Sequence, residues 1–316
     1  MTRNAKQIQR DVFKEEFKKF FRENIRSGLD KIEIYRKWAI AGCSVIGAII
    51  AIIAIIVIYI VFMGETEVDS DLFELVGYII FGLCAAITGI IKLYKTKAKE
   101  GILPKLLGYI GDFEINKNTS VIAEDRSYIE TLDLFRHFNR YKCDDRFSGI
   151  YKGIKVDIAE IDLEKESGSG RRRHVETIFS GVFLKIPSLK KFKGKTIVVS
   201  NFQLGINGKQ QVHLEDPEFE KRYNTYGTDQ IEARYLITPA FMNRMIELSK
   251  KGACKNISLS FEYDSVNIAV SSNKDWFEVP FTKPATEISN YRGIILDLLV
   301  IFSIIDSLKL DMNIGM

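Results

Sequence analysis

The chain has 316 residues, of which 46% are hydrophobic and 27% are charged, and its formal net charge is +4. The excess positive charge lies in two short segments: residues 1–37 hold 11 Lys/Arg against six Asp/Glu, and residues 92–105 hold five against one. From residue 106 onward, 29 basic residues balance 29 acidic residues. A neutral domain lacks the basic face that binds nucleic acid, so the charge distribution argues against a nucleic-acid partner.

Two apolar stretches predict a transmembrane helical hairpin. Ala39–Met63 has 25 residues without a charge, and at ~1.5 Å per residue such a helix exceeds the ~30 Å hydrocarbon thickness of a bilayer. Leu72–Ile91 carries one charge, Glu74, near its outer end, where a carboxylate can reach the interface. We expect spans at about 39–63 and 72–91 within a membrane segment of residues 38–93. The alternative is a hairpin buried in a soluble core.

The charges that flank the two spans predict their orientation. Lys and Arg precede the first span and follow the second, whereas residues 64–75 hold five acidic residues and no basic ones. Basic flanks are retained on the cytoplasmic side of a membrane. We therefore expect a multi-pass protein of the cell inner (plasma) membrane, with both termini in the cytoplasm and the lipid bilayer as one partner.

The N-terminal arm, residues 1–37, has the pattern of an amphipathic helix. Apolar residues recur at helical spacing with charged residues between them: Val12, Phe13, Phe17, Phe20, Phe21 and Ile25. Such a helix can lie on the bilayer surface or pack on the protein's own cytoplasmic domain, and the sequence leaves both open. We expect the Ser27-Gly28 pair to interrupt it.

Residues 94–316 predict a cytoplasmic α+β domain with a mainly antiparallel sheet and packed helices. Short helices are expected at 104–113 and 127–138, and strands at 146–151, 154–163, 174–186, 195–200, 257–263, 266–271 and 276–281. Lys152-Gly153 predicts a tight hairpin turn. A phase change along the second strand predicts a bulge near Ala159 and Glu160, and the alternation along residues 257–263 predicts a sheet with one solvated face.

The last apolar segment is Tyr291–Leu310. Asp297 and Asp306 divide it into apolar runs that are short for a membrane span. We therefore expect a helix buried against the sheet, with a third span as the alternative.

Residues 214–248 carry a family resemblance. They contain the runs LEDPEFEKRYNTY and TDQIEARYLITPAFMNRMIEL, and IFSGVFLKI and FKGKTIVVS come before them. With these runs the chain resembles the bacterial membrane proteins grouped as domain-of-unknown-function family 3137, over roughly residues 70–310. The resemblance implies a transmembrane hairpin ahead of this domain. It implies no established activity, so no catalytic residues can be transferred.

Two Xaa-Pro pairs in the same region predict helix starts. Asp216-Pro217 and Thr238-Pro239 each place a side-chain acceptor at the N-cap and a proline at the first helical position. Gly252 is expected to end the second of these helices in the left-handed conformation.

Two groups of charged residues are candidate binding sites. Asp229, Glu232 and Arg234 could orient a ligand or act as acid and base; alternatively, Arg234 pairs with a carboxylate as part of the fold. A second group, Arg171, Arg172 and Arg173, follows a Ser/Gly segment that we expect to be flexible. These arginines could dock on an anionic membrane or an acidic protein, and the alternative is a solvated loop.

The motifs in the sequence do not predict catalysis or a cofactor. Gly194-Lys195-Thr196 copies the end of a Walker A loop, but Leu189 stands where the motif needs glycine, and a strand follows where it needs a helix. The three histidines are isolated, and no cysteine pair has metal-ligand spacing. We therefore expect no metal and no other cofactor.

The sequence favours a membrane-anchored cytoplasmic module that binds or regulates another protein, without catalysis. Small residues permit close contact between membrane helices, so self-association is a further expectation: Gly47 and Ala51, Gly82 and Ala86, Ala85 and Gly89. Two alternatives stay open. One is a subunit of an oligomeric channel or transporter; the other is a membrane-tethered enzyme that uses the Asp229 group or Asp144 and Asp145.

Overall fold

The structure is a computed structural model that describes residues 15–63, 70–110, 112–114, 126–188, 191–200, 210–250, 256–272 and 276–308. The helices are η1 Phe21–Ile25 (a π-helical turn), α2 Arg26–Met63, α3 Ser70–Ile110, α4 Arg126–Thr131, η2 Gly170–Arg172, α5 Pro217–Glu220, α6 Gln230–Leu236, α7 Pro239–Lys250, η3 Ile288–Tyr291 and α8 Arg292–Leu308. The strands are β1 Asp112–Glu114, β2 Arg140–Tyr151, β3 Ile154–Ser167, β4 His174–Pro187, β5 Thr196–Ser200, β6 Gln210–Gln211, β7 Tyr223–Gly227, β8 Asn256–Glu262 and β9 Ser265–Ser271.

The chain divides into two compact units. The helical unit comprises Met1–Lys105 and Glu278–Gly293, and the sheet unit comprises Leu106–Phe277 and Ile294–Met316. This division differs from the predicted boundary between residues 93 and 94. Residues 94–105 of α3 and a segment of 16 residues, 278–293, belong to the helical unit, whereas the last residues of α3, 106–110, belong to the sheet unit.

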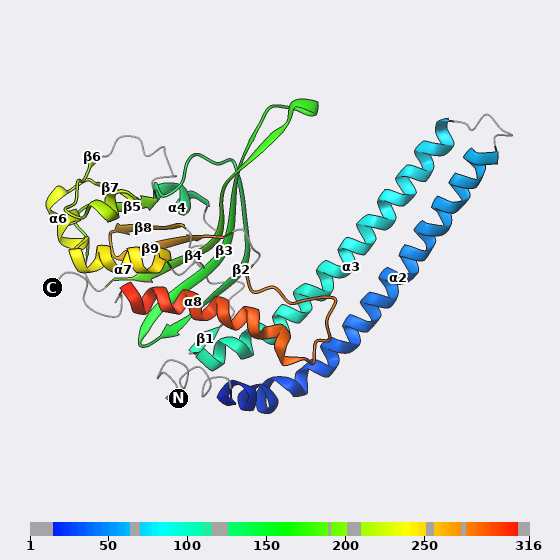
Figure 1. Ribbon diagram of the computed structural model, residues 1–316, viewed down its shortest axis with the longest axis horizontal. Helices are drawn as coiled ribbons and strands as arrows, with labels where there is room; N and C mark the ends of the chain where they lie inside the picture. The colour runs from blue at the N-terminus through cyan, green and yellow to red at the C-terminus, as the bar shows by residue number, and fades with distance from the viewer. Residues whose placement is uncertain are drawn as a thin grey trace, which may run out of the picture. The chain divides into compact units, whose positions relative to one another are not determined.

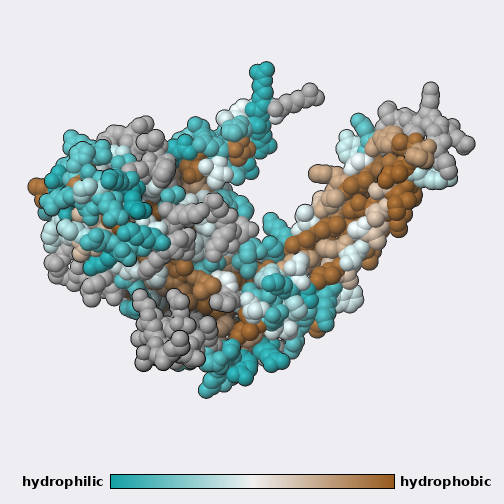
Figure 2. Space-filling model, viewed as in Figure 1, coloured by the Kyte–Doolittle hydropathy of each residue, from teal (hydrophilic) through white to brown (hydrophobic). Residues whose placement is uncertain are grey.

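The helical unit contains two long apolar helices, α2 and α3 (Figure 1). Gly28–Phe62 and Phe73–Tyr109 are each long and apolar enough to cross a membrane, and no residue in their hydrophobic windows is buried. A brown, hydrophobic surface runs along both helices in Figure 2. The two apolar helices of the prediction are therefore confirmed. The predicted outer loop and the apolar residues Val12 and Phe13 lie outside the described residues.

The helix that precedes the first apolar stretch is continuous with it. Residues 15–20 are helical, η1 adds a π-helical turn, and α2 continues to Met63, so the predicted break at Ser27-Gly28 is wrong. Burial along one side explains the continuity, because it outweighs the ~1 kcal/mol that a helical glycine costs. The buried side chains are Phe17, Phe21, Ile25 and Leu29. Since the Phe21 ring lies 5.6 Å from that of Tyr291, this helix packs on protein.

The second long helix passes through Pro104 and ends at Ile110. The separate helix predicted at 104–113 is therefore wrong. A proline inside a helix costs ~3 kcal/mol, but each fully buried aliphatic side chain gains ~1.5–3 kcal/mol. Four such side chains flank Pro104 and lie at 4% exposure or less: Ile102, Leu103, Leu106 and Leu107.

The sheet unit holds one sheet, with the order β1-β2-β3-β4-β9-β8-β5-β7-β6 among the described strands (Figure 1). All of these pairings are antiparallel, so the predicted α+β class with a mainly antiparallel sheet is confirmed. The turn between β2 and β3 uses Lys152 at φ 51° and Gly153 at φ 82°. Two consecutive residues at positive φ match the twist of a two-residue hairpin.

Both faces of this sheet are covered, so the predicted solvated face is wrong. The alternate residues Ser258 and Ser260 of β8 are 2% and 0% exposed. The segment around α4 covers one face, where Ile129, Leu132, Leu134 and Phe138 join the core. On the other face, Phe241 of α7 packs on Phe261 of β8 with ring centroids 6.0 Å apart.

Burial on both faces also explains the phase change along β3. Residues 156–161 are all buried, so apolar residues occupy both sides of the strand. The register shift lies on β2, between Cys143 and Arg146, which pair with Ile161 and Ala159. The predicted bulge is therefore opposite Glu160, but its extra residue belongs to the partner strand.

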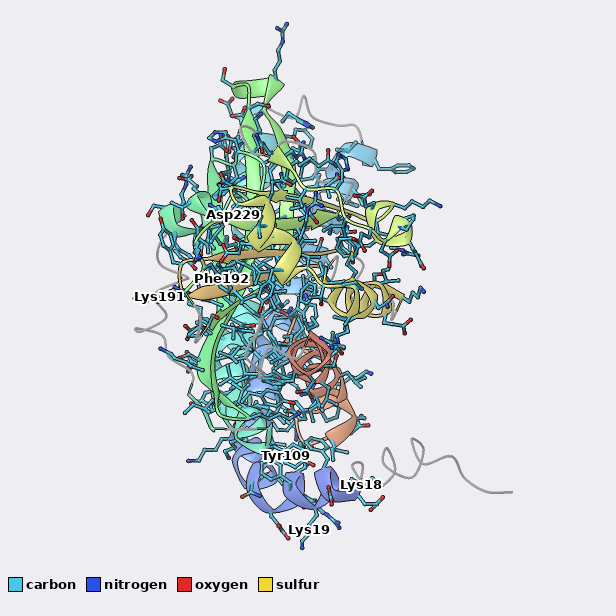
Figure 3. The ribbon with its side chains drawn as sticks, turned by 90° about the vertical axis from the view of Figure 1, so that its left-hand side faces the viewer. Lys18, Lys19, Tyr109, Lys191, Phe192 and Asp229 are labelled. Carbon is cyan, nitrogen blue, oxygen red and sulfur yellow. The ribbon has the colours of Figure 1, made fainter. Side chains whose placement is uncertain are left out.

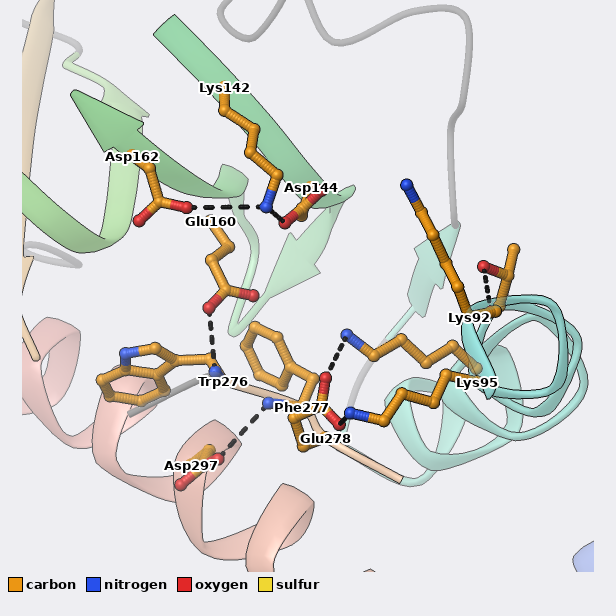
Figure 4. A network of polar contacts seen from close by, with 12 residues as sticks. Lys92, Lys95, Lys142, Asp144, Glu160, Asp162, Trp276, Phe277, Glu278 and Asp297 are labelled. Atoms are coloured by element: carbon orange, nitrogen blue, oxygen red, sulfur yellow. Dashed lines mark hydrogen bonds and ion pairs between the residues drawn. The ribbon is translucent and has the colours of Figure 1, made fainter. Parts of the chain in front are cut away.

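Two other predictions differ from the structure. The helix predicted at 127–138 ends at Thr131, where the chain turns and Asp133 adopts φ 55°. The strand predicted at 276–281 is absent, since Phe277 adopts φ 57° and side chains bind the local backbone donors. The N–H of Trp276 donates to Glu160 (2.8 Å) and that of Phe277 to Asp297 (3.4 Å) (Figure 4). Strands β1, β6 and β7 were not predicted.

The C-terminal helix α8 is the third helix that is long and apolar enough to cross a membrane. It differs from α2 and α3 because 53% of its hydrophobic window is buried. Near its end, Asp306 accepts hydrogen bonds from Tyr151 (3.1 Å) and Lys152 (2.7 Å) of the β2–β3 turn. These contacts support the predicted buried helix over a third span.

Candidate functional site

A two-stranded arm projects from the sheet at the β3–β4 hairpin (Figure 1). The neighbouring strand β2 begins opposite Glu164, and β9 ends opposite Gly181. Residues 165–167 and 174–176 therefore pair with each other beyond the ends of both neighbours. We call residues 165–176 the arm and residues 168–173 its tip.

Polar side chains fix the arm where it leaves the sheet. The Asn139 side chain donates to the Glu166 carbonyl and accepts from its N–H, both at 2.7 Å, so an amide continues the ladder where β2 has ended. Arg140 pairs with Glu164 at 3.0 Å. Arg136 pairs with Glu176 at 2.6 Å. The arm is therefore held from the side of β2 and from the segment that precedes it.

Two glycines fix the shape of the tip. Gly168 and Gly170 adopt φ 78° and 58°, values that favour glycine. A Cβ atom on Gly168 would lie 2.3 Å from the carbonyl oxygen of Arg172. The Ser/Gly segment, which the sequence predicted to be flexible, therefore forms a defined turn followed by η2.

The three arginines of the tip differ in their contacts. Arg173 binds both oxygens of Glu166, at 2.6 and 2.8 Å. Arg172 is exposed and has no ion pair within the described part of the chain. The Arg171 side chain lies outside the described atoms. The arm holds Lys165 and three arginines against Glu166 and Glu176, so its formal charge is +2.

The second candidate group lies at the start of α6, and its side chains do not converge. Asp229, which is labelled in Figure 3, caps the helix. It accepts from the N–H groups of Ile231 (2.9 Å) and Glu232 (3.0 Å). The Glu232 carboxylate is 8% exposed and turns to another loop. Arg234 is exposed, without an ion pair to the described residues. We find no arrangement here that could act as acid and base on one ligand.

Glu232 occupies the loop that copies the end of a Walker A motif. Its two oxygens accept from the N–H groups of Lys193 (3.0 Å) and Gly194 (2.7 Å). The next N–H, of Lys195, donates to Thr228 Oγ1 at 2.8 Å. The backbone donors that a phosphate would need are bound to the chain's own side chains, which argues against a nucleotide at this loop.

The Xaa-Pro pairs lie at helix starts. Asp216 accepts from the N–H groups of Glu218 (2.8 Å) and Phe219 (3.1 Å), and Pro217 begins α5. Thr238 Oγ1 accepts from the N–H of Phe241 at 3.2 Å, and Pro239 begins α7. Gly252 lies outside the described residues.

The alternative catalytic pair, Asp144 and Asp145, lies in the bulge of β2. Asp144 binds Lys142, which also lies 3.7 Å from Asp162 (Figure 4). The hydrogen bond that Lys142 donates to Asp144 raises the pKa of Lys142. Asp144 therefore belongs to a partly exposed ion network. Within the described residues, no group of three or more His, Cys, Asp or Glu could hold a metal ion.

A polar network in the helical unit was not predicted. We call residues 278–293 the strap. Glu33 of α2 accepts from Arg36 at 2.7 and 2.8 Å and from the N–H of Ala285 in the strap at 2.7 Å. Lys95 of α3 pairs with Glu278 at 2.7 Å (Figure 4). The strap residues Glu278 and Ala285 stand about 180 and 250 residues from their partners Lys95 and Glu33, so no local pattern could indicate these contacts.

Comparison with known proteins gives a family match in the carboxyl-terminal part of the chain. Residues 177–310 match the family model described as "Protein of unknown function (DUF3137)". Over these residues, the chain is similar to that family. The match runs from Thr177 in β4 to Leu310 and so includes β5 to β9, the strap and α8.

One solved structure is similar to the chain: the crystal structure of the mycobacterial trehalose monomycolate transport factor A, TtfA. It is 11% identical, with 64% of this chain and 91% of that chain covered, at a TM-score of 0.35. No curated protein matches the chain.

Proposed function

We propose that the protein is a membrane-anchored protein-binding module. In this proposal α2 and α3 form a hairpin across the cell inner (plasma) membrane, both termini and the sheet unit lie in the cytoplasm, and the arm binds an acidic segment of a partner protein. The module acts by holding that partner at the membrane and needs no catalytic step.

The observation that carries the anchoring is the exposure of α2 and α3. Their hydrophobic windows have mean hydropathies of 3.3 and 2.0 with no buried residue. Exposed apolar surface in water costs ~25 cal/mol per Å², and Trp38, Phe62 and Phe81 are 74%, 89% and 75% exposed. A bilayer removes this cost along the whole length of both helices. The basic flanks favour cytoplasmic termini.

The arm supports the second half of the proposal. It projects beyond its neighbouring strands, its tip has a defined shape, and it is locally basic within a neutral unit. Arginine binds carboxylates through two parallel hydrogen bonds, as Arg173 does with Glu166. Arg172 has the same chemistry and no described ion pair. An acidic peptide segment is the partner that fits this tip.

A cysteine-labelling experiment tests the anchoring. In a background without the native cysteines, Thr66→Cys should react with an impermeant thiol reagent on intact cells, because the proposal places residue 66 outside. Ser169→Cys, at the tip of the arm, should react only after the cells are opened. Labelling of Ser169→Cys with protection of Thr66→Cys would reverse the topology.

A crosslinking experiment tests the arm. A photoactivatable residue at Ser169 in the full-length, membrane-embedded protein should capture a protein partner, and 300 mM added salt should weaken the capture. Substitution of Arg171, Arg172 and Arg173 by Gln should reduce capture about tenfold or more. The matched control replaces three exposed lysines of the sheet unit by Gln and should leave capture unchanged: Lys155, Lys193 and Lys221. An equal loss of capture in both triple variants would show that net charge causes the effect. It would reject the proposal that the arm binds the partner.

A further inference from the structure

The helical unit has two different faces where α2 and α3 leave the apolar stretches. On one face, Glu33 and Arg36 of α2 and Tyr94 of α3 contact the strap. Arg36 donates to the Phe281 carbonyl at 3.4 Å, and the Tyr94 and Phe281 rings lie 5.4 Å apart. Arg36 and Tyr94 are accordingly 8% and 3% exposed. Protein covers this face.

The opposite face of the same helical turns is open. Tyr35 and Trp38 of α2 are 52% and 74% exposed, and Leu93 of α3 is 64% exposed. The Lys97 ammonium lies 4.6 Å from the centroid of the Tyr35 ring, so a cation–π contact joins the two helices here. Lys31, Tyr35 and Trp38 of α2 and Leu93 and Lys97 of α3 lie on this face, and Lys37 and Lys92 are exposed at its edges. We call these seven residues the belt.

The lysines that contact the strap and the lysines of the belt have different partners. Lys95 and Lys99 lie 2.7 and 3.7 Å from Glu278 of the strap. The four belt lysines are exposed, and none of them has an ion pair with the described residues. The belt therefore carries positive charge that its own unit leaves available to another molecule.

The sequence places the belt at the edge of the apolar stretches. Lys37 and Trp38 come directly before Ala39, and Lys92 comes directly after Ile91. Tryptophan and tyrosine favour the membrane interface, and each lysine near an anionic surface gains ~1 kcal/mol, which is roughly a fivefold preference. The aromatic rings and lysines thus lie together where phospholipid headgroups begin.

We propose that the belt binds the headgroups of anionic phospholipids in the cytoplasmic leaflet. The proposal rests on the membrane anchoring proposed above. It adds a lipid selectivity to that anchoring: the protein would concentrate anionic lipid around the cytoplasmic end of its hairpin, where the strap does not cover it.

The two tryptophans of the chain allow a direct test. Trp276 is 1% exposed in the sheet unit, whereas Trp38 belongs to the belt. In full-length Trp276→Phe protein, all tryptophan emission comes from Trp38. The protein is reconstituted into vesicles of equal amounts of phosphatidylglycerol and phosphatidylcholine, with bromine on the chains of one lipid or of the other. Brominated phosphatidylglycerol should quench Trp38 as if enriched severalfold around it.

Substitution of the four belt lysines identifies the source of the selectivity. With Lys31, Lys37, Lys92 and Lys97 changed to Gln, the two brominated lipids should quench equally. The same four positions changed to Arg should keep the preference, and so should Gln at Arg171, Arg172 and Arg173 of the arm. Equal quenching in the parent protein, or a preference that survives the four Gln substitutions, would overturn the belt proposal.

The outcomes separate the belt from the anchoring. If neither brominated lipid quenches Trp38, the proposed insertion fails; if both quench it equally, insertion stands and the belt fails. A second measurement needs no tryptophan substitution. Mass spectrometry of lipid retained by the purified native protein should give a phosphatidylglycerol share severalfold above that of the membrane, and the four Gln substitutions should return it to the membrane value.

Discussion

The tip of the arm and the start of α6 are both charged segments beside a turn, yet their charges are used differently. At α6 the carboxylates of Asp229 and Glu232 each accept two backbone N–H groups. At the tip, one arginine binds a neighbouring carboxylate, and Arg172 extends into solvent. A cluster of charges in a sequence therefore indicates a site only where the local backbone leaves those charges available.

The chemical difference lies in what each side chain can bind. Helix starts and tight loops present unpaired N–H groups, and a carboxylate is the natural acceptor for them. Arginine has donors only, and the carbonyl groups of a β-ribbon are largely paired across the ribbon. Acidic side chains therefore find backbone partners within the fold more readily than arginines do. For this reason the arm is a better candidate than the start of α6 for binding an external partner.

The largest expected effect that tests this comparison is the loss of the Glu232 carboxylate. Glu232→Ala leaves the N–H groups of Lys193 and Gly194 without an acceptor next to a buried side chain, at a cost of ~2–3 kcal/mol. Urea unfolding of the detergent-solubilised Trp38→Phe protein, followed by the emission of Trp276, measures it. Glu218→Ala, at a carboxylate 54% exposed, is the control and should change the free energy of unfolding by less than ~0.5 kcal/mol.

A smaller loss is expected at the helix caps. Asp229→Ala and Thr238→Ala should each lower the free energy of unfolding by ~1 kcal/mol, because each removes a side-chain acceptor for N–H groups in a first helical turn. The same unfolding assay applies. An unchanged free energy of unfolding for Asp229→Ala would contradict the capping role. It would favour the alternative that Asp229 binds a ligand.

The arm should tolerate the removal of its charges. Replacement of Arg171, Arg172 and Arg173 by Gln should change the free energy of unfolding by less than ~1 kcal/mol, because Arg173 and Glu166 form a solvent-exposed ion pair. The same variant is expected to lose the partner. A destabilisation of 2 kcal/mol or more would mean that the arginines serve the fold, as Glu232 does.

The smallest effect on the free energy of unfolding is expected at Asp157, a buried carboxylate that lies opposite a lysine. It lies opposite Lys185 on β4 and is buried, and burial raises its pKa above the ordinary value of 3.8. A raised folded-state pKa stabilises the protein below the ordinary pKa, and this stability is lost as pH rises through the folded value. Asp157→Asn should therefore be slightly more stable than the parent at pH 7. Urea unfolding of both proteins between pH 7 and pH 3.5 measures this difference. The free energies of unfolding of Asp157→Asn and the parent should become equal as the pH falls.

Much of the sheet could be predicted because its hairpins follow one another along the chain. Local sequence pattern was enough to predict β3, β4 and the turn at Lys152-Gly153. Strand β7, with the sequence YNTYG, has little apolar pattern, and pairing with β5 stabilises it. Tertiary contacts explain the other errors. Burial of its neighbours allows α3 to continue through Pro104. At Trp276 and Phe277 the backbone N–H groups donate to side-chain carboxylates and not to a neighbouring strand.

For the candidate sites, the sequence could name residues but not their partners. The composition of the tip indicated its charge, although only the positive φ of Gly168 and Gly170 gives it a fixed shape. Glu232 stood in the right cluster, yet its acceptor role depends on a loop some 38 residues earlier. The strap contacts join residues about 250 positions apart, beyond any periodic signal.

The discontinuity of the helical unit has a consequence for biosynthesis. Its first part ends at Lys105 and its second begins at Glu278, so 173 further residues must be translated before the two can meet. At ~5–20 residues per second, this delay is roughly 9 to 35 seconds. During that interval Glu33, Arg36, Lys95 and Lys99 have no strap beside them. A nascent hairpin therefore lacks part of its own compact unit until residues 278–293 have been translated.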